Sequence, residues 1–340
     1  MKKLLKYISP LAPDDSGACS VLYEMGGITV ICDAGGCAGN VCGFDEPRWF
    51  EKRSALFSAG LRDMDAILGR DDRLVEKLTK VTRQVEARFT AIVGTPVPAV
   101  IATDYKALQR MSERRTGLPC LTIASDGTGL YDKGEEEAYY KLFERFAQEK
   151  RALIKGKVGI IGATPLNTGL TTAKKLMEHY DNAVCFGLDS SLDEVINASS
   201  CERIAVIAPS GLRAAKYLKE RFGTPFTTEY PLIPEAVKAK AGECGGKRVL
   251  IIHQQMAANA LRELIDSQDV TVGSLFMLDK GYAQAQDVHI KDEEALRELV
   301  LTGGYDVIFA DISLKRALKE YSGEFIDLSH YAVSGRLSLS

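Results

Sequence analysis

The sequence predicts an α/β protein built from three Rossmann-like parallel-sheet domains around a central cleft. Short β-branched runs alternate with amphipathic helical patterns along the whole chain, and repeated β-α-β units imply parallel sheets covered by helices. The chain has 340 residues, which is more than one ordinary core holds. We therefore predict domains over residues 1–150, 151–240 and 241–340.

The first unit contains three short apolar runs and two helical patterns. Its strands are expected at residues 28–31, 90–93 and 120–123. A helix is expected over 72–88, where Leu74, Leu78 and Val81 recur at helical spacing, and a second over 135–150.

The second and third units repeat this alternation. In the second, strands are expected at 156–162, 183–186 and 204–207, and helices near 174–177, 193–198 and 211–221. Gly223 and Pro225 follow the last of these helices and form a normal stop signal. In the third, strands are expected at 245–252, 270–275 and 305–309, and helices at 257–265 and 314–321.

The composition excludes two classes of partner. The net charge of −3 gives no electrostatic basis for binding nucleic acid. No apolar run approaches the roughly 18–20 residues that span a bilayer, and no apolar h-region follows the basic start at 1–6. We therefore expect a cytoplasmic protein with no membrane partner, whose eight cysteines are thiols or metal ligands rather than disulfides.

Half of the cysteines crowd a glycine-rich stretch near the N-terminus. Cys19, Cys32, Cys37 and Cys42 have the spacing C-x12-C-x4-C-x4-C. Glycines let the backbone approach an inorganic cluster, and thiolates in loops are the usual ligands of iron–sulfur clusters and zinc. These four cysteines are our candidate cofactor ligands. Zinc and buried free thiols are the alternatives, and Cys32 also fits a small buried residue at a strand end.

Several segments, taken in order, resemble one family. Residues 13–19 resemble the segment with the family's first cluster cysteine. Cys32-Asp-Ala-Gly-Gly-Cys37 resembles its His-Gly-Ser-x-Gly-Cys, so Cys37 matches the second cluster cysteine and Cys32 replaces the histidine. Further matches lie at 63–69, 189–195, 217–226, 305–311 and 327–328. The chain thus resembles the nitrogenase component 1 type oxidoreductases. These include nitrogenase molybdenum–iron protein subunits, protochlorophyllide reductase subunits and reductive cyclase subunits that make a nickel tetrapyrrole.

The resemblance implies an iron–sulfur oxidoreductase subunit that accepts electrons from a separate ATP-dependent iron–sulfur reductase. Its substrate would be a small molecule or tetrapyrrole-like compound, and its cluster a 4Fe–4S cluster. No cysteine stands near 94–97 or 206–208, where nitrogenase subunits carry their third cluster cysteine and their cofactor cysteine. We therefore expect no iron–molybdenum cofactor and no reduction of dinitrogen.

Two ligand arrangements follow from the matched cysteines. Cys19 and Cys37 would share a cluster between two chains, in a homodimer or a paralogous heterodimer. Alternatively, Cys42 and Cys32 would complete a ligand set within one chain. The resemblance leaves both arrangements open.

Four residues in loops after expected strands are candidates for the substrate cleft, because parallel sheets bind ligands beyond their carboxyl ends. Gly162 and Asn167 lie in a loop that either receives an anion at a helix N-terminus or is an ordinary strand–helix turn. His253 follows a buried strand and can bind a metal or relay protons. Asp311 either faces the cleft or caps the next helix. No catalytic residue is assigned.

Two other functions fit the same sequence. A cofactor-assembly scaffold would hold a cluster precursor and perform no turnover. A non-catalytic protein of the same fold would bind a metabolite or metal ion.

Overall fold

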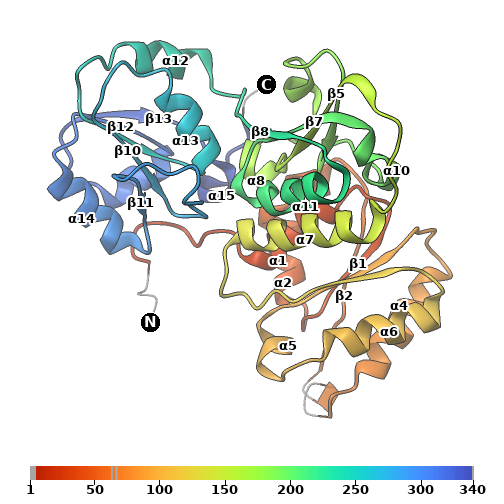
Figure 1. Ribbon diagram of the computed structural model, residues 1–340. Coiled ribbons are helices and arrows are strands. Elements are labelled where there is room, and N and C mark those ends of the chain that lie inside the picture. The colour runs from red at the N-terminus through yellow and green to blue at the C-terminus, as the bar shows by residue number, and fades with distance from the viewer. Residues whose placement is uncertain (1–4, 63, 66–67, 339–340) are drawn as a thin grey trace.

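The computed structural model describes residues 5–62, 64–65 and 68–338, and it contains three β-sheets. The sheets occupy residues 28–123, 154–228 and 249–327, which we call the first, second and third regions. Neighbouring strands pair in parallel in each of them. Figure 1 shows the first region at the bottom, the second at the upper right and the third at the upper left. The predicted α/β architecture of three parallel-sheet units is confirmed.

The first region has the strand order β2-β1-β3-β4. Its strands are β1 (Ile28–Ile31), β2 (Ala55–Ser58), β3 (Thr90–Val93) and β4 (Cys120–Ile123). Its helical segments are α1 (Asp14–Leu22), α2 (Gly36–Asn40), the π-helical turn η1 (Val41–Asp45), the 3-10 turn η2 (Pro47–Phe50), α4 (Asp71–Thr82), α5 (Pro96–Val100), α6 (Tyr105–Thr116) and α7 (Tyr131–Phe146). Helices α4 and α6 bury apolar residues against one face of the sheet, and α1 and α7 cover the other.

The second region has the strand order β6-β5-β7-β8. Its strands are β5 (Ile154–Ile161), β6 (Ala183–Phe186), β7 (Cys201–Val206) and β8 (Phe226–Thr228). Its helical segments are α8 (Pro165–Thr168), α9 (Lys174–Met177), α10 (Leu192–Ile196), η3 (Ala198–Ser200), η4 (Pro209–Gly211) and α11 (Leu212–Phe222). Helix α11 ends where Gly223 adopts a left-handed conformation, as its stop signal predicts.

The third region has the strand order β11-β10-β9-β12-β13. Its strands are β9 (Val249–Ile252), β10 (Val270–Ser274), β11 (Val288–His289), β12 (Val307–Ala310) and β13 (Glu324–Asp327). Its helical segments are α12 (Glu235–Gly242), α13 (Gln255–Arg262), α14 (Glu293–Gly303), the 3-10 segment η5 (Ile312–Ala317) and α15 (Tyr331–Ser334). The helix expected at 314–321 is wrong: η5 replaces it, because Asp311 accepts a bond from the Ser313 N–H and starts a tighter turn.

Helix α7 joins the first two regions into one core. Its buried residues Tyr139, Leu142 and Phe143 belong to a single hydrophobic cluster that also contains residues of β3 and β7. The Phe143 and Phe186 rings meet edge to face, with centroids 5.0 Å apart. Helix α1 packs against α7 so closely that a Cβ on Gly17 would lie 1.8 Å from the Tyr131 carbonyl oxygen. The helix that carries Cys19 is therefore fixed against the centre of the molecule.

Two of the expectations above concern residues that the structure does not describe. Asp63, Ala66 and Ile67, which belong to the matched segment 63–69, lie outside the described residues, and so does most of the basic stretch 1–6. Among the described helices, none combines the length and the apolar character needed to cross a membrane.

Candidate functional site

The four candidate cysteines come from neighbouring elements of the first region. Cys19 lies on α1 and is buried, and Cys32 is the residue directly after β1. Cys37 lies on α2 and Cys42 in η1, and both are partly exposed. Cys37 and Cys42 therefore present thiols near the surface above the buried thiol of Cys19.

The structure groups three of the four and separates Cys32 from them. Along β1, side chains alternate between the two faces of the sheet. Ile28, Val30 and Cys32 pack into the core under α4, whereas Cys19, Cys37 and Cys42 belong to the core on the α1 and α7 side. Cys32 thus occupies the position of a small buried residue at a strand end.

Carboxylates surround the three grouped thiols. Burial and the charges of Asp15 and Glu46 hold the pKa of Cys19 well above its usual value. Burial, Asp15 and Asp33 raise the pKa of Cys37 to about 11, and burial and Glu46 raise the pKa of Cys42. The metal-free thiols are therefore protonated at neutral pH, and any metal must displace protons to be ligated.

Thr95 lies two residues after β3 and directly before α5, in the segment where the family resemblance expects a third cysteine. Its side chain is fully buried, and its hydroxyl donates to the Cys32 carbonyl oxygen at 2.8 Å. The Thr95 hydroxyl also lowers the pKa of Cys37, whereas the Asp15 carboxyl group raises it. An oxygen-bearing side chain from each of these two residues therefore acts on the Cys37 thiol.

Two aspartates that the sequence reasoning missed hold the cysteine-bearing turn in place. Asp33 accepts a bond from the Ala38 N–H (2.9 Å) at the start of α2 and one from the Ser58 hydroxyl (2.5 Å). Asp45 accepts bonds from Ser16 on α1 (2.6 Å) and Asn40 (2.7 Å). Their positions, directly after Cys32 and three residues after Cys42, were the available signal.

The donors of one chain do not make a complete metal site. Within the described residues, no three His, Cys, Asp or Glu side chains lie close enough together to hold a metal ion. Cys37 and Cys42 are partly exposed and Cys19 is buried, so each chain offers thiols of both kinds on this side of the first sheet.

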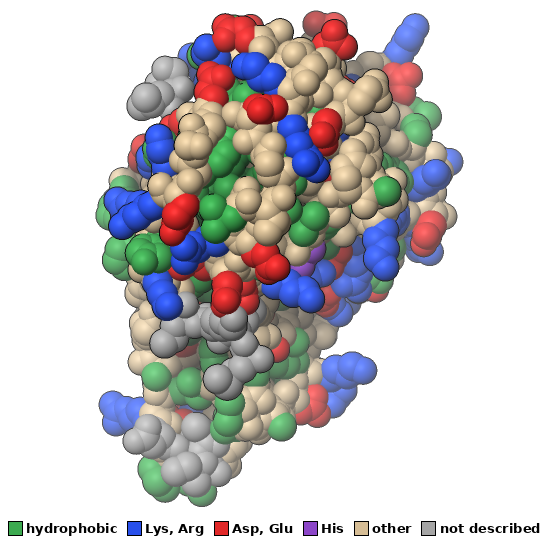
Figure 2. Space-filling view, turned by 90° about the vertical axis from the view of Figure 1, so that its left-hand side faces the viewer, with side chains coloured by type: hydrophobic (Ala, Val, Ile, Leu, Met, Phe, Trp, Pro, Cys, Tyr) green, Lys and Arg blue, Asp and Glu red, His purple; other side chains and the backbone are tan. Residues whose placement is uncertain are grey.

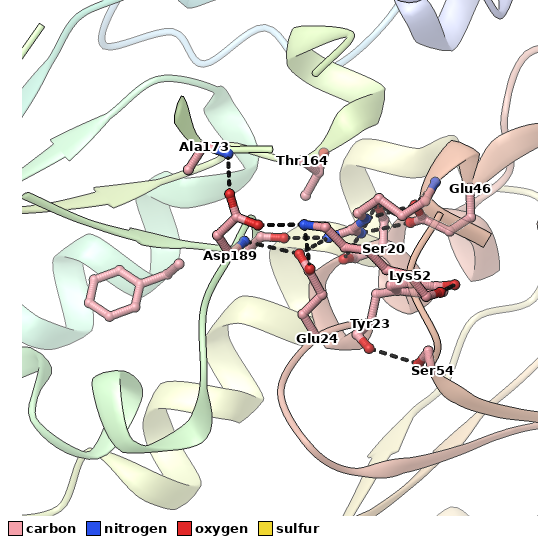
Figure 3. Close-up of polar contacts among 12 residues, drawn as sticks. Ser20, Tyr23, Glu24, Glu46, Lys52, Ser54, Thr164, Ala173 and Asp189 are labelled. Carbon is pink, nitrogen blue, oxygen red and sulfur yellow. Dashed lines mark hydrogen bonds and ion pairs between the residues drawn. The ribbon is translucent and has the colours of Figure 1, made fainter. Parts of the chain in front are cut away.

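A polar network ties the part of the first region that carries these thiols to the second region (Figure 3). Ser20 lies on α1, and Glu24 lies two residues after its end. Glu46 follows η1, and Asp189 lies three residues after β6. Glu24 accepts bonds from Arg48 (3.0 Å), Lys52 (2.6 Å) and the Asp189 N–H (3.0 Å).

The candidate cleft residues are buried at the junction of the three regions. The Asn167 amide donates to Glu135 (2.7 Å) and accepts from the Tyr131 hydroxyl (2.8 Å), which also contacts His330 at 3.1 Å. His253 stacks on His330, with ring centroids 4.2 Å apart, and burial lowers the pKa of His253 to about 4.

The other two candidates also have structural partners. Asp311 accepts bonds from the His330 N–H (2.9 Å) and the Ser334 hydroxyl (2.7 Å). Gly162 has φ +95 and would place a Cβ 2.8 Å from the Ala208 nitrogen. The structure therefore brings Asn167, His253 and Asp311 to one polar junction through His330, but it buries them instead of exposing them on a cleft wall.

An open cleft lies elsewhere, between the second and third regions. It has a volume of about 650 Å³ and is lined by Tyr180, Arg203 and Glu229 on one side and by Asn259, Arg262 and Tyr282 on the other. The Nε atom of Arg262 and the Oδ1 atom of Asn259 are buried without a hydrogen-bond partner in the described chain.

Comparison with known proteins gives a consistent assignment. A sequence profile described as nitrogenase component 1 type oxidoreductase matches residues 16–239. Two curated relatives are nitrogenase iron-molybdenum cofactor biosynthesis proteins NifE. The one from Clostridium pasteurianum is 23% identical over 174 residues, and the one from Bradyrhizobium diazoefficiens is 22% identical over 176 residues. The matches cover 50% of this chain but only 38% and 32% of those relatives.

Solved structures extend the likeness over nearly the whole chain. A structure of nitrogenase Cp1 at pH 6.5 superposes with a TM-score of 0.70 at 11% identity, covering 96% of this chain and 87% of that one. A structure of nitrogenase Cp1 at pH 5 gives 0.67 at 13% identity, covering 99% and 86%. At these identities the likeness shows the fold.

Proposed function

The chain belongs to the nitrogenase component 1 type oxidoreductase family, and on that premise we propose that it is an iron–sulfur subunit that completes its cluster with a second chain. The observation that carries this proposal is the grouping of Cys19, Cys37 and Cys42 on one side of the first sheet. Cys32 faces the other side and is left out of the ligand set.

The surface around the three grouped thiols supports a second chain as their complement. Large apolar side chains close to the cysteine turn and to Thr95 in sequence are exposed, among them Phe44 (74% exposed), Phe50 (76%) and Val100 (86%). Figure 2 shows hydrophobic side chains exposed on the lower part of one face as well as on its upper part. Apolar exposure on this scale marks interaction surfaces. A second copy fits best, because it would supply the missing thiols from the same turn.

In this proposal the chain's own residues hold, orient and insulate the cofactor. Cys19 on α1 and Cys37 and Cys42 in the surface turn are the candidate ligands, and two of them from each of two chains would make up the four thiolates that a 4Fe–4S cluster takes. A 4Fe–4S cluster supplies one-electron chemistry when bound. A separate ATP-dependent iron–sulfur reductase supplies the electrons, and no iron–molybdenum cofactor is required.

We place the substrate in the cleft between the second and third regions. Domain interfaces are preferred ligand sites, and about 650 Å³ suits a small organic molecule. Asn259 and Arg262 line this cleft, and the Asn259 Oδ1 and Arg262 Nε atoms are buried without a hydrogen-bond partner among the described residues. A polar small molecule that reaches them would satisfy both atoms.

A second candidate function is a cofactor-assembly scaffold. It is favoured by the two NifE relatives, whose names describe proteins of cofactor biosynthesis. A scaffold would release its bound cluster to an acceptor protein, whereas an electron-transfer subunit would retain it during reduction and reoxidation.

The test is the iron and acid-labile sulfide content after strictly anaerobic purification. We expect about two irons per chain in a dimer, lost in Cys37→Ala and kept in the matched control Cys32→Ala. Iron that persists in Cys37→Ala, or a folded wild type that takes up none after reconstitution, would overturn the proposal. Transfer of the cluster to an apo acceptor protein, measured by the same iron assay, would support the scaffold function instead.

A further inference from the structure

Arg48 is a fully buried cation whose five N–H groups all have partners. Its Nε and one Nη2 N–H donate to the two carboxylate oxygens of Glu46, both at 2.7 Å. The other Nη2 N–H donates to the Ser20 carbonyl oxygen at 2.6 Å. Its Nη1 donates to Glu24 (3.0 Å) and to the Gly187 carbonyl oxygen (2.6 Å). A planar fork satisfied on every side is rigid, and lysine cannot reproduce it.

These partners belong to the elements that carry the grouped cysteines. Ser20 directly follows Cys19 on α1, and its hydroxyl also donates to Glu46 at 2.9 Å. Glu46 lies four residues after Cys42, at the end of η1, and its charge acts on both Cys19 and Cys42. The guanidinium therefore spans the distance between the Cys19 helix and the Cys42 turn.

One of the four partner residues, Gly187, comes from the second region. Gly187 has φ +131, a conformation that a residue with a side chain rarely adopts, and this directs its carbonyl oxygen at Arg48. Two residues on, Asp189 has φ 48, accepts a bond from the Ala173 N–H at 2.7 Å and pairs with Lys52. Figure 3 shows how these contacts converge between the two regions.

We propose that Arg48 is a positioning residue that fixes Cys19 and Cys42 relative to each other and to the second-region loop 187–189. It touches neither a cofactor nor a substrate, and it acts through Ser20 and Glu46. The proposal deepens the proposed function, because the fixed separation is that of two cluster ligands. It is tested first on the metal-free chain, so that its failure and the failure of the proposed function are distinguishable.

The first experiment measures alkylation of each cysteine by N-ethylmaleimide in the reduced, metal-free, full-length chain, resolved by peptide mass spectrometry. In Arg48→Gln we expect labelling of Cys19 to accelerate about tenfold or more, while buried Cys120 and Cys185 keep their wild-type rates. Arg48→Lys should give a Cys19 labelling rate similar to that of Arg48→Gln, because a lysine ammonium keeps the charge but cannot donate to all the acceptors at once.

The matched control is Arg262→Gln, which breaks a largely buried ion pair with Asp287 in the third region. It should leave Cys19 at its wild-type rate. If the Arg48→Gln chain does not fold, Glu24→Gln removes only the partly exposed partner and should accelerate Cys19 selectively but less. An unchanged Cys19 rate, or equal acceleration at Cys120, would overturn the proposal.

The second experiment repeats the iron assay on reconstituted Arg48→Lys. We expect folded protein with a reduced iron content or an altered electron paramagnetic resonance spectrum of the reduced cluster. Wild-type iron and an unaltered spectrum would overturn the positioning role. A wild type without iron would instead overturn the proposed function, while the labelling result would still stand.

Discussion

Replacing Glu135 by Gln should remove a pH dependence of stability that one buried carboxyl group creates. Glu135 is fully buried on α7 and accepts bonds from Ser210 (2.7 Å), Asn167 (2.7 Å) and Thr164. Burial raises the pKa of Glu135 from 4.5 to about 8, although these bonds oppose the rise. The folded chain therefore keeps a proton that the unfolded chain releases.

The sign and the size of the change in unfolding free energy follow from the difference between the folded and unfolded pKa values of Glu135. A raised folded-state pKa stabilises the fold fully below the unfolded pKa, and this contribution is lost as the pH rises through the folded value. Between pH 4.5 and about 8 the free energy of unfolding should fall by about 1.4 kcal/mol per pH unit from this group. The whole window of 3.5 units corresponds to roughly 5 kcal/mol.

The assay is urea unfolding of wild type and Glu135→Gln at several pH values from 5 to 8.5, with all thiols reduced. Other titrating groups, such as His253, contribute equally to both chains and cancel in the difference between the two curves. Glutamine keeps the side-chain shape and one acceptor oxygen. Parallel curves for the two proteins would refute the reasoning, because Glu135 would then be ionised in the folded chain.

Three further predictions concern the site and its support. Asp15→Asn removes a negative charge beside Cys37, so the pKa of Cys37 should fall from about 11 and its alkylation by iodoacetamide at pH 8.5 should accelerate; an unchanged rate would contradict the contact. Tyr131→Phe removes the hydroxyl that contacts Asn167 and His330 and should cost about 1–3 kcal/mol of unfolding free energy in urea. Gly17→Ala should cost about 3 kcal/mol or more at the tight crossing of α1 and α7, whereas Gly36→Ala, with open space around it, should change thermal stability little.

The sequence was sufficient for the strands that are compact apolar runs, including the edge strands β4 and β6, and insufficient for the other edge strands. The expected strands at 28–31, 90–93, 120–123 and 183–186 are present at those residues because each is a compact apolar run. The edge strands β2, β8, β11 and β13 were not predicted. These four strands are partly exposed, and residues such as those of Glu324–Asp327 therefore lack a continuous apolar signal, whereas β4 and β6 are mostly buried.

The predicted helix boundaries were wrong for local reasons. Helix α7 begins at Tyr131 and not at 135, because Gly134 and Asp132 hide the first turn from a propensity argument. Tertiary packing overrides that propensity: a Cβ on Gly134 would lie 1.7 Å from the Asp14 carbonyl oxygen, so glycine is what the α1 contact requires.

The site shows what spacing alone can miss. Cysteine spacing brought Cys32 into the candidate set, yet Ile28, Val30 and Cys32 alternate along β1 and face α4. Arg48 was not predicted as a functional residue because arginine is normally exposed, and its burial depends on partners from two distant segments, residues 20–24 and Gly187. Thr95 likewise becomes a neighbour of Cys37 only through the pairing of β1 with β3.

The charge around the thiols also bears on what kind of electron donor the proposed cluster needs. Asp15, Asp33 and Glu46 direct negative charge at the thiols, and the charge of Arg48 is taken up by Glu46 and Glu24. An electron added at this position enters a negative field in a partly buried environment, and both factors lower a reduction potential. A site of this kind requires a strongly reducing donor. This is the property that an ATP-dependent iron–sulfur reductase would contribute, and it connects the acidic surroundings of Cys19 and Cys37 to the partner inferred for the chain.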